Sequence, residues 1–547
     1  TVMEPNEKLE LWRSRYRRAE AAYSAELSRM DTREAQYLGQ RSLRSLVPGD
    51  SKISAPHVRN IISEMIETQV DSTIPQPRVT AIRECDRELA RRIEDMLRNE
   101  LNRLPFESLN DMMERTVPLQ GCGFFLVEWD SRVHTRSTTG ELSVSVIHPK
   151  QVIPQEGVTG SIADMDYFFV RVPQTKEYLA RRYHVNPAQI CDDGETENPD
   201  ELVTAVTAYY RGEDGRIGLY TWAGDTELCD MEDYQSLRGE PEVICLTDGT
   251  AVTPEPYSPD LFPLVAQKNI SVFGRFCGES DADKVADQQN TINRMESKII
   301  DKLLRSGSYL TLPDNASITS DAEDMKVIRP GSAADKAMID VYNLEGKIDQ
   351  DLLFLEQVYQ EGRQIIGITD SYQGRADGTA ISGRAKQFAA NQSAGRFRSK
   401  RVQKEAAYAQ LFELMFRFRL AYACEPRPVV SRDMRGNTCY GTFDRRDFLE
   451  QDESGSWYFN DRFLFSCDSS VQKNSDRETL WNQARENLTS GAYGDPSALS
   501  TLILFWSKME ELDYPGAGDT RAYLMEQSAE REAPSASLED EEEVTII

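Results

Sequence analysis

Apolar side chains recur at intervals of three, four or seven residues in several parts of the chain, the pattern of amphipathic helices. The pattern is clearest over residues 281–304, where five positions follow it: Val285, Ile292, Met295, Ile299 and Leu303. The longest predicted helix covers residues 379–423, with no internal proline and with Gly383 and Gly395 as its weakest points. The same criterion predicts further helices over residues 4–38, 57–70, 86–103, 106–117, 175–183, 349–366, 477–488, 497–512 and 520–527.

Between these helices lie short segments of β-branched and aromatic residues, bounded by turns that contain Gly, Pro or Asp. These segments predict strands over residues 124–129, 142–147, 203–211, 217–222, 242–246, 309–312, 325–328, 457–459 and 463–467. The mixture of long helices and short strands predicts an α+β fold. At 547 residues the chain is long enough for two or three domains or for one large subunit.

Charges are unevenly distributed along the predicted helix over residues 281–304. Its start is acidic and its end is basic, through Asp281, Asp283, Asp287, Lys298, Lys302 and Arg305. This distribution complements the helix dipole. Two acidic clusters, Asp281/Asp283 and Asp321/Glu323/Asp324, have the ligand chemistry for Mg²⁺, although a solvated acidic turn is the commoner explanation of such spacing.

The composition is that of a folded protein, with 39% hydrophobic and 28% charged residues. The formal net charge of −28 argues against a protein that grips nucleic acid through its phosphates, because that role needs clustered Lys and Arg. Two interpretations stay open: simple solubility, or a surface past which DNA moves without adhering.

Nine cysteines are scattered singly, and none forms a C-x-x-C pair, so we expect reduced cytosolic thiols and no metal framework. We also expect no signal peptide and no membrane span, because apolar stretches such as residues 499–506 are too short for a bilayer.

Catalytic motifs are missing. There is no H-E-x-x-H, no phosphate-binding P-loop and no G-x-S-x-G elbow, and the segment from Gly374 to Gly378 lacks the Lys and the glycine spacing of a nucleotide site. The four histidines are predicted to be structural or solvent-exposed: His57, His134, His148 and His184. We therefore predict no enzymatic activity, no cofactor and no bound metal.

The order of the central elements is distinctive: helix, small strand-turn module, helix, polar loop with glycines, and very long helix. Four stretches carry it, namely Phe262-Pro263-Leu264-Val265, Gly278-Glu279-Ser280-Asp281, Ile366-Gly367-Ile368-Thr369-Asp370 and Thr379-Ala380-Ile381-Ser382-Gly383-Arg384-Ala385. In this order and spacing, over roughly residues 35–525, the chain resembles bacteriophage portal proteins.

The resemblance implies a homo-oligomer, usually a twelve-subunit ring, around a central channel for double-stranded DNA. It implies a wing over residues 1–280, a first stem helix over 281–308, a clip over 309–348 and a second stem helix over 349–368. It further implies a tunnel loop over 369–378, a long wing helix with returning strands over 379–470, a helical crown over 471–527 and a disordered acidic tail over 528–547.

The same resemblance assigns residues and partners. In and just after the tunnel loop, the DNA-facing residues are Tyr372, Gln373, Arg375, Asp377 and Arg384, and the stem contributes Asp281, Asp283, Asp287, Lys298 and Lys302. For Arg375 and Arg384, guiding or braking DNA and pairing with a neighbouring acid remain equal alternatives.

The clip is expected to bind the large terminase subunit during packaging and the head–tail adaptor afterwards. The wing is expected to contact the major capsid and scaffold proteins. This places the protein at the capsid portal vertex of the virion, after assembly in the host bacterial cytoplasm.

Two alternatives remain. A phage DNA-processing enzyme such as a Mg²⁺-dependent nuclease needs a clustered carboxylate site, and another head–tail connector component is usually much shorter and lacks the stem–clip–stem order.

Overall fold

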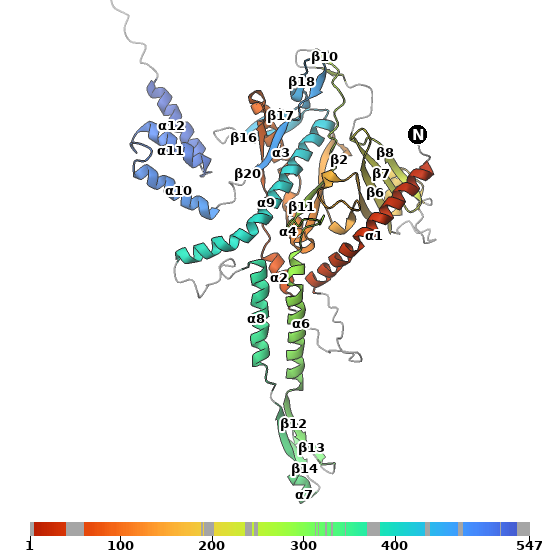
Figure 1. Ribbon diagram of the computed structural model, residues 1–547. Helices are drawn as coiled ribbons and strands as arrows, with labels where there is room; N and C mark the ends of the chain where they lie inside the picture. The colour runs from red at the N-terminus through yellow and green to blue at the C-terminus, as the bar shows by residue number, and fades with distance from the viewer. Residues whose placement is uncertain are drawn as a thin grey trace, which may run out of the picture.

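The computed structural model is a mixed body of helices and sheets from which one long stalk projects (Figure 1). The predicted α+β class is confirmed. The structure describes residues 5–39, 59–187, 190, 202–235, 243–245, 250–311, 313–314, 317–322, 325–329, 332–344, 346–368, 383–432, 438–468, 474–512, 514 and 516–532.

The N-terminal helix α1 (Pro5–Tyr37) covers an antiparallel five-stranded sheet. Its strands, in spatial order, are β4 (Val152–Pro154), β5 (Tyr167–Thr175), β6 (Leu202–Arg211), β7 (Ile217–Ala223) and β8 (Thr226–Met231). Trp12 is 3% exposed and its ring centroid lies 5.8 Å from that of Tyr167 and 4.9 Å from that of Tyr210. The aromatic positions of α1 therefore pack onto the sheet.

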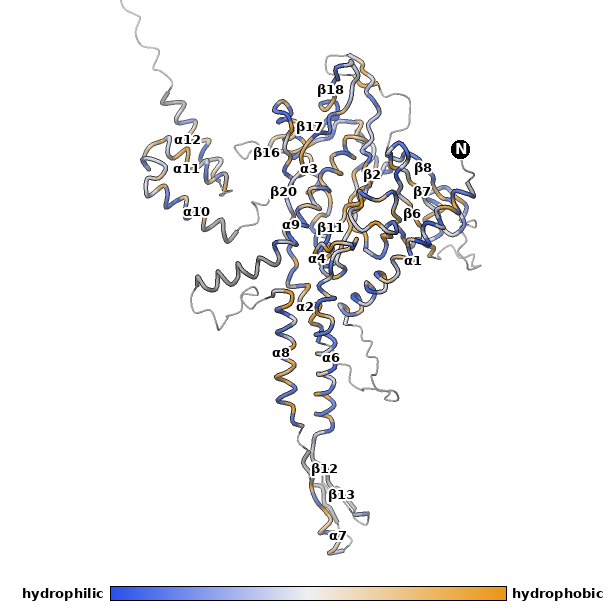
Figure 2. Tube along the Cα trace, viewed as in Figure 1, coloured by the Kyte–Doolittle hydropathy of each residue, from blue (hydrophilic) through white to orange (hydrophobic). Residues whose placement is uncertain are grey.

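The largest core lies around a second antiparallel sheet, in the order β11 (Leu264–Lys268), β2 (Cys122–His134) and β3 (Thr139–Ile147). Three helices contribute to it: α3 (Arg87–Arg103), α4 (Phe106–Gln120) and α9 (Gly383–Tyr422). Tyr408 and Phe412 of α9 are 0% exposed, and the Tyr408 ring packs edge-on against Phe125 of β2 at 5.5 Å. Figure 2 shows hydrophobic segments gathered within this body.

The body joins residues from before and after the stalk. Strand β1 (Gln76–Ala81) pairs antiparallel with β20 (Phe463–Asp468), with Val79 opposite Phe465. Further two-stranded pairs join β9 (Ile244–Cys245) to β10 (Ala251–Val252), β16 (Arg427–Arg432) to β17 (Thr438–Phe443) and β18 (Leu449–Gln451) to β19 (Trp457–Phe459).

We call residues 281–366 the stalk. Helix α6 (Asp281–Arg305) leads away from the body and α8 (Asp349–Ile366) returns to it (Figure 1). Between them is the tip, in which β12 (Gly307–Thr311) pairs with β15 (Asp340–Leu344) and β13 (Ser317–Ala322) with β14 (Met325–Arg329), followed by α7 (Ala333–Ala337). The short helix α2 (Ile61–Glu67) packs where the stalk meets the body.

Three C-terminal helices form a small cluster of their own: α10 (Asn474–Thr489), α11 (Leu499–Glu511) and α12 (Ala517–Glu532). Their shared core contains Ala484, Phe505, Met509 and Ala517. Helix α12 continues to Glu532, past residue 527 where the sequence predicted the helices to end.

Two expectations need correction. Cys122 and Cys277 form a disulfide, although every cysteine was expected to be reduced. These cysteines are 155 residues apart, so no local spacing of cysteines in the sequence predicts their pairing. The sequence also missed β1, β5, β8 and the β16–β17 pair, whereas α6 and α8 begin at the predicted residues. In the described part of the chain, none of the helices has the length and apolar character that a membrane crossing needs.

Candidate functional site

The candidate site is the stalk and its root, where the sequence placed the stem residues. Helices α6 and α8 share an apolar core with α2, built from Val285, Ile292, Leu355, Val358, Ile61 and Met65, among others. One side of each stalk helix is buried in this core, which fixes how the two helices face one another.

Asp281 opens α6 and is almost wholly buried, with 2% of its surface exposed. It forms an ion pair with Lys400 of α9, and Asn269 donates from Nδ2 to its Oδ1 at 3.2 Å. The preceding Ser280 is the N-cap, since its Oγ accepts from the backbone N–H of Ala282 at 3.1 Å. The first acid of α6, Asp281, is therefore buried and paired, whereas the sequence favoured a solvated acidic turn.

Lys400 lies in an unusual position for a lysine. Its Nζ also donates to Gln69 Oε1 at 2.6 Å, and burial lowers the pKa of its ammonium. One turn further along α9, Lys404 is 4% exposed and its Nζ lies 3.0 Å from Glu114. Burial raises the pKa of the Glu114 carboxyl. Lys400, which is partly buried, and Lys404, which is buried, thus fix α9 against the stalk root and α4.

Asp283 reaches a different part of the body. Arg33 of α1, 1% exposed, donates to Asp283 from Nε at 2.8 Å and from Nη2 at 2.6 Å. The same guanidinium pairs with Glu26 at 2.8 Å and donates to the Gln120 carbonyl at 3.1 Å. The first turn of α6 is therefore held by cations from α1 and α9, two helices far apart in the sequence.

At the far end of α6, the basic residues predicted from the sequence form ion pairs that connect α6 to α8. Lys298 lies 3.3 Å from Asp351 of α8, and Lys302 also forms an ion pair with it. The hydrogen bond from Lys302, with that from Lys298, lowers the pKa of the Asp351 carboxyl. Asp287 is exposed on the surface of α6.

The sequence analysis assigned no contact or role to Gln289, which is 2% exposed. Its Oε1 accepts from the backbone N–H groups of Ile61 at 2.8 Å and Ile62 at 3.3 Å, and its Nε2 donates to the Arg59 carbonyl at 2.8 Å. Gln289 thus supplies hydrogen-bond partners to backbone groups at the start of α2 that have no partner within the helix. A polar residue on the apolar side of the predicted α6 was the only available signal.

The stalk also exposes many large apolar side chains. The exposed fractions are 48% for Leu303, 69% for Leu304, 44% for Leu352, 72% for Leu353, 46% for Phe354 and 41% for Ile365. Leu352 to Phe354 are consecutive on α8 and so point in different directions around it. Each of the two stalk helices buries one side against the other, and the rest of its surface is left exposed.

The predicted tunnel-loop residues Tyr372, Gln373, Arg375 and Asp377 lie outside the described residues. Arg384 lies in the first turn of α9. Of the second acidic cluster, Asp321 lies in β13, and Glu323 and Asp324 are outside the described residues. Among the described residues, no group of three or more His, Cys, Asp or Glu is placed to hold a metal ion.

Two of the histidines have polar contacts. His148 Nε2 lies 2.7 Å from Glu34, its Nδ1 accepts from the backbone N–H of Lys150 at 3.2 Å, and burial lowers its pKa. His184 ends α5 (Lys176–Tyr183) at a φ of 57°, a left-handed C-cap. His134 is exposed, and His57 lies outside the described residues.

No protein-family model and no curated protein matches the chain. Among solved structures, it is similar to a chain of "Virion of native gene transfer agent (GTA) particle", with 11% identity, a TM-score of 0.36, and coverage of 87% of this chain and 98% of that one. It is also similar to a chain of "Neck of native GTA particle computed with C12 symmetry", with 9% identity, a TM-score of 0.34, and coverage of 81% and 88%. Scores this low do not establish a shared fold.

We expect Lys400→Met to destabilise the protein strongly, because it leaves Asp281 charged and buried without its cation. Breaking a buried pair from one side costs about 3–5 kcal/mol. Adding Asp281→Asn should recover most of that loss. The measurement is chemical unfolding followed by circular dichroism. Lys284→Met is the matched control, because its partner Glu279 is 39% exposed. Equal stability of Lys400→Met and wild type would contradict the assignment.

Asp351→Asn should loosen the far end of the stalk. Because the pKa of Asp351 is lowered in the folded protein, its ion pairs stabilise the stalk above the usual carboxyl pKa, and this stabilisation is lost as the pH falls through the lowered value. At neutral pH, amide exchange over residues 296–305 and 349–355 should be about two- to fivefold faster. Asp349→Asn, in the same turn, should leave exchange unchanged. An equal effect of both variants would show that no specific pair is involved.

Proposed function

We propose that this chain is a bacteriophage portal subunit, which assembles with copies of itself into a ring around a channel for double-stranded DNA. The observation that carries the proposal is the order of α6, tip, α8 and α9 along the chain. An antiparallel helical stalk extends from a mixed body, ends in small strand pairs, and returns to a long helix (Figure 1). This is the stem–clip–stem–wing order that the sequence resemblance implies.

The stalk surface supports assembly with further copies. Six large apolar side chains of α6 and α8 are at least two-fifths exposed, and five of them lie where the two helices meet the tip. Contiguous exposed apolar surface on a soluble protein marks a place where another molecule packs. In a closed ring each stalk has a neighbour on both sides, which suits apolar positions that point in several directions.

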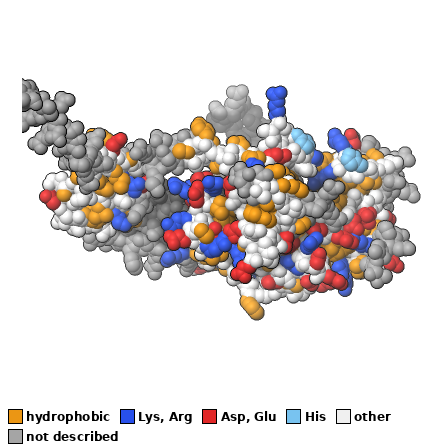
Figure 3. All heavy atoms as spheres, turned by 90° about the horizontal axis from the view of Figure 1, so that it is seen from above, with side chains coloured by type: hydrophobic (Ala, Val, Ile, Leu, Met, Phe, Trp, Pro, Cys, Tyr) orange, Lys and Arg blue, Asp and Glu red, His pale blue; other side chains and the backbone are white. Residues whose placement is uncertain are grey.

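The net charge of the chain suits a channel through which DNA passes better than a protein that binds DNA tightly. The net charge of −28 is multiplied by the number of subunits in a ring, and such a field opposes lasting phosphate contacts. Acidic and basic side chains are intermingled on the face seen from above (Figure 3). A few bases in or beside the tunnel loop, Arg375 and Arg384, are the proposed contacts with moving DNA.

The tip is the proposed binding site for the large terminase subunit and, later, the head–tail adaptor. It is the part of the stalk farthest from the body, and it exposes Met338 and Val341, at 64% and 54% (Figure 1). The body is the proposed contact with major capsid and scaffold proteins. With these assignments, the proposed location of the ring is the portal vertex of a virion.

Negative-stain electron microscopy of the purified full chain tests the proposal. We expect ring-shaped particles with a central hole. Leu353→Glu should reduce the fraction of rings by at least about tenfold, because each interface would bury a carboxylate. Ile82→Glu is the matched control, since Ile82 is equally apolar and 60% exposed but lies outside the stalk. A compact monomer for the wild-type chain would overturn the proposal.

Deleting residues 372–377 tests the tunnel loop separately. Rings should still assemble, because the stalk core and its root are untouched, whereas DNA packaging or retention should fall. Packaged DNA is measured as nuclease-resistant genome copies per particle. Wild-type packaging and retention by the deleted chain would show that these residues do not serve DNA passage.

A further inference from the structure

A covalent link lies just above the stalk root. Cys122, the first residue of β2, is bonded through sulfur to Cys277, four residues before α6 begins. The two residues are 1% and 3% exposed. The bond therefore ties the central sheet directly to the segment that leads into the stalk.

Backbone contacts hold the same two segments together independently of the sulfurs. The backbone N–H of Asn269 donates to the Gly121 carbonyl at 3.0 Å, and that of Glu279 donates to the Ile270 carbonyl at 2.9 Å. Gly121 has a φ of 85°, and a Cβ there would lie 2.4 Å from the Gly278 carbonyl oxygen. The two glycines permit this close approach, so the two sulfurs would stay adjacent after reduction.

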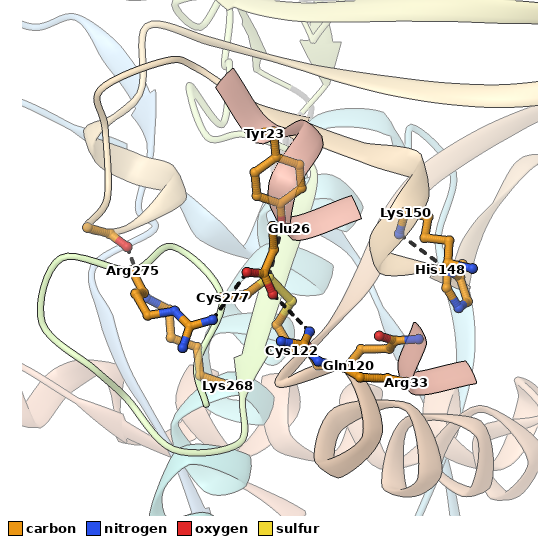
Figure 4. Close-up of a disulfide and its surroundings, with 11 residues drawn as sticks. Tyr23, Glu26, Arg33, Gln120, Cys122, His148, Lys150, Lys268, Arg275 and Cys277 are labelled. Carbon is orange, nitrogen blue, oxygen red and sulfur yellow. Dashed lines mark hydrogen bonds and ion pairs between the residues drawn. A yellow bond between two sulfur atoms is a disulfide. The ribbon is translucent and has the colours of Figure 1, made fainter. Parts of the chain in front are cut away.

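One of the two cysteines lines a cavity and the other does not. A cavity of about 210 Å³ is lined by Tyr23, Glu26, Arg275 and Cys277, among other residues, but not by Cys122. The Tyr23 hydroxyl lies 3.3 Å from Cys277 Sγ. In Figure 4 the side chains of Tyr23 and Glu26 point toward the disulfide, and Arg275 reaches Glu26, with Nη2 3.1 Å from its carboxylate.

We propose that Cys122 and Cys277 form a thiol–disulfide exchange site for small-molecule thiols, with Cys277 as the sulfur that is attacked. The incoming thiolate forms a bond to Cys277 Sγ, the Sγ–Sγ bond breaks, and its electron pair leaves on Cys122 Sγ, which takes a proton. A second small thiol then forms the small-molecule disulfide and releases the Cys277 thiol. The reverse reaction uses a small-molecule disulfide as the oxidant.

Another cysteine of the chain, Cys467, is only partly buried and serves as a contrast. Cys467 Sγ donates to the Glu405 carbonyl at 3.2 Å, and burial raises the pKa of its thiol to about 12. The thiolate is the reactive form, so Cys467 is expected to be inert. Cys277 differs from Cys467 because it has a bonded sulfur partner and lines a cavity.

The two oxidation states would differ in how firmly the stalk root is held. Opening the disulfide removes a constraint across 155 residues of chain and leaves the backbone contacts in place. If the chain is a virion component, which rests on the proposed function, assembly occurs in a reducing cytoplasm and the particle later meets an oxidising exterior. The site would then be reduced during assembly and oxidised in the released particle.

The test equilibrates the full chain in glutathione buffers from fully reduced to fully oxidised, blocks free thiols with an alkylating agent, and maps each cysteine by mass spectrometry. Cys122 and Cys277 should change state together within this range, whereas Cys467 should never join a disulfide. The reduced protein should unfold several degrees lower. In single variants, oxidised glutathione should mark Cys277 in Cys122→Ser at least about tenfold faster than Cys122 in Cys277→Ser, because only Cys277 lines the cavity.

Three results would overturn the proposal: Cys122 and Cys277 alkylated at every ratio, a disulfide that persists in fully reduced glutathione, or equal marking of both sulfurs. The wild-type titration needs no variant, so it stands even where a variant fails to fold. Its outcome is independent of ring formation by electron microscopy, so failure here leaves the proposed function intact.

Discussion

The stalk depends on one constraint, the pairing of the acidic first turn of α6 with cations of the body. A carboxylate removed from water is costly unless a cation and hydrogen bonds replace its hydration. Asp281 is buried and meets this requirement with Lys400 from α9 and Asn269 from the loop after β11. Asp283 stays partly in contact with solvent and pairs with Arg33 of α1, which is itself buried. Apolar packing alone would let α6 slide or rotate, whereas these pairs are satisfied at one position. The direction of the stalk is therefore set by charge pairing among elements that lie up to 250 residues apart.

That dependence explains which parts of the structure the sequence predicted. The periodicity of apolar residues located α6 and α8 well, because it reflects the local side of each helix that faces their shared core. The acids and bases of α6 were also recognised, as a complement to the helix dipole and, through the resemblance, as stem residues. Their partners in the structure are Arg33, Lys400 and Asp351. No local pattern in the sequence identifies these partners, because tertiary proximity decides the pairing. The disulfide between Cys122 and Cys277 escaped prediction for the same reason.

Strands were harder to predict where their neighbours come from distant parts of the chain. The sequence analysis predicted no strand at residues 75–77, Pro-Gln-Pro, and proline lacks the N–H that a central strand needs. The structure places Pro77 opposite Cys467 in the two-stranded pair of β1 and β20, where one edge of β1 has no strand partner. The body core is thus closed by residues on either side of the stalk, and a division of the chain into consecutive segments does not describe it.

The stalk carries more apolar residues than its own two helices can bury. Leu355 and Val358 of α8 are buried against α6 and α2, while Leu353, between them and the tip, is 72% exposed. A pair of helices has only one mutual interface, so apolar residues placed around α8 exceed what α6 covers. The ion pairs at the root hold this apolar surface in a fixed orientation relative to the body. In the proposed ring, every stalk would therefore face its neighbours in the same way. Assembly along the stalk would thus depend on the buried charges at its root.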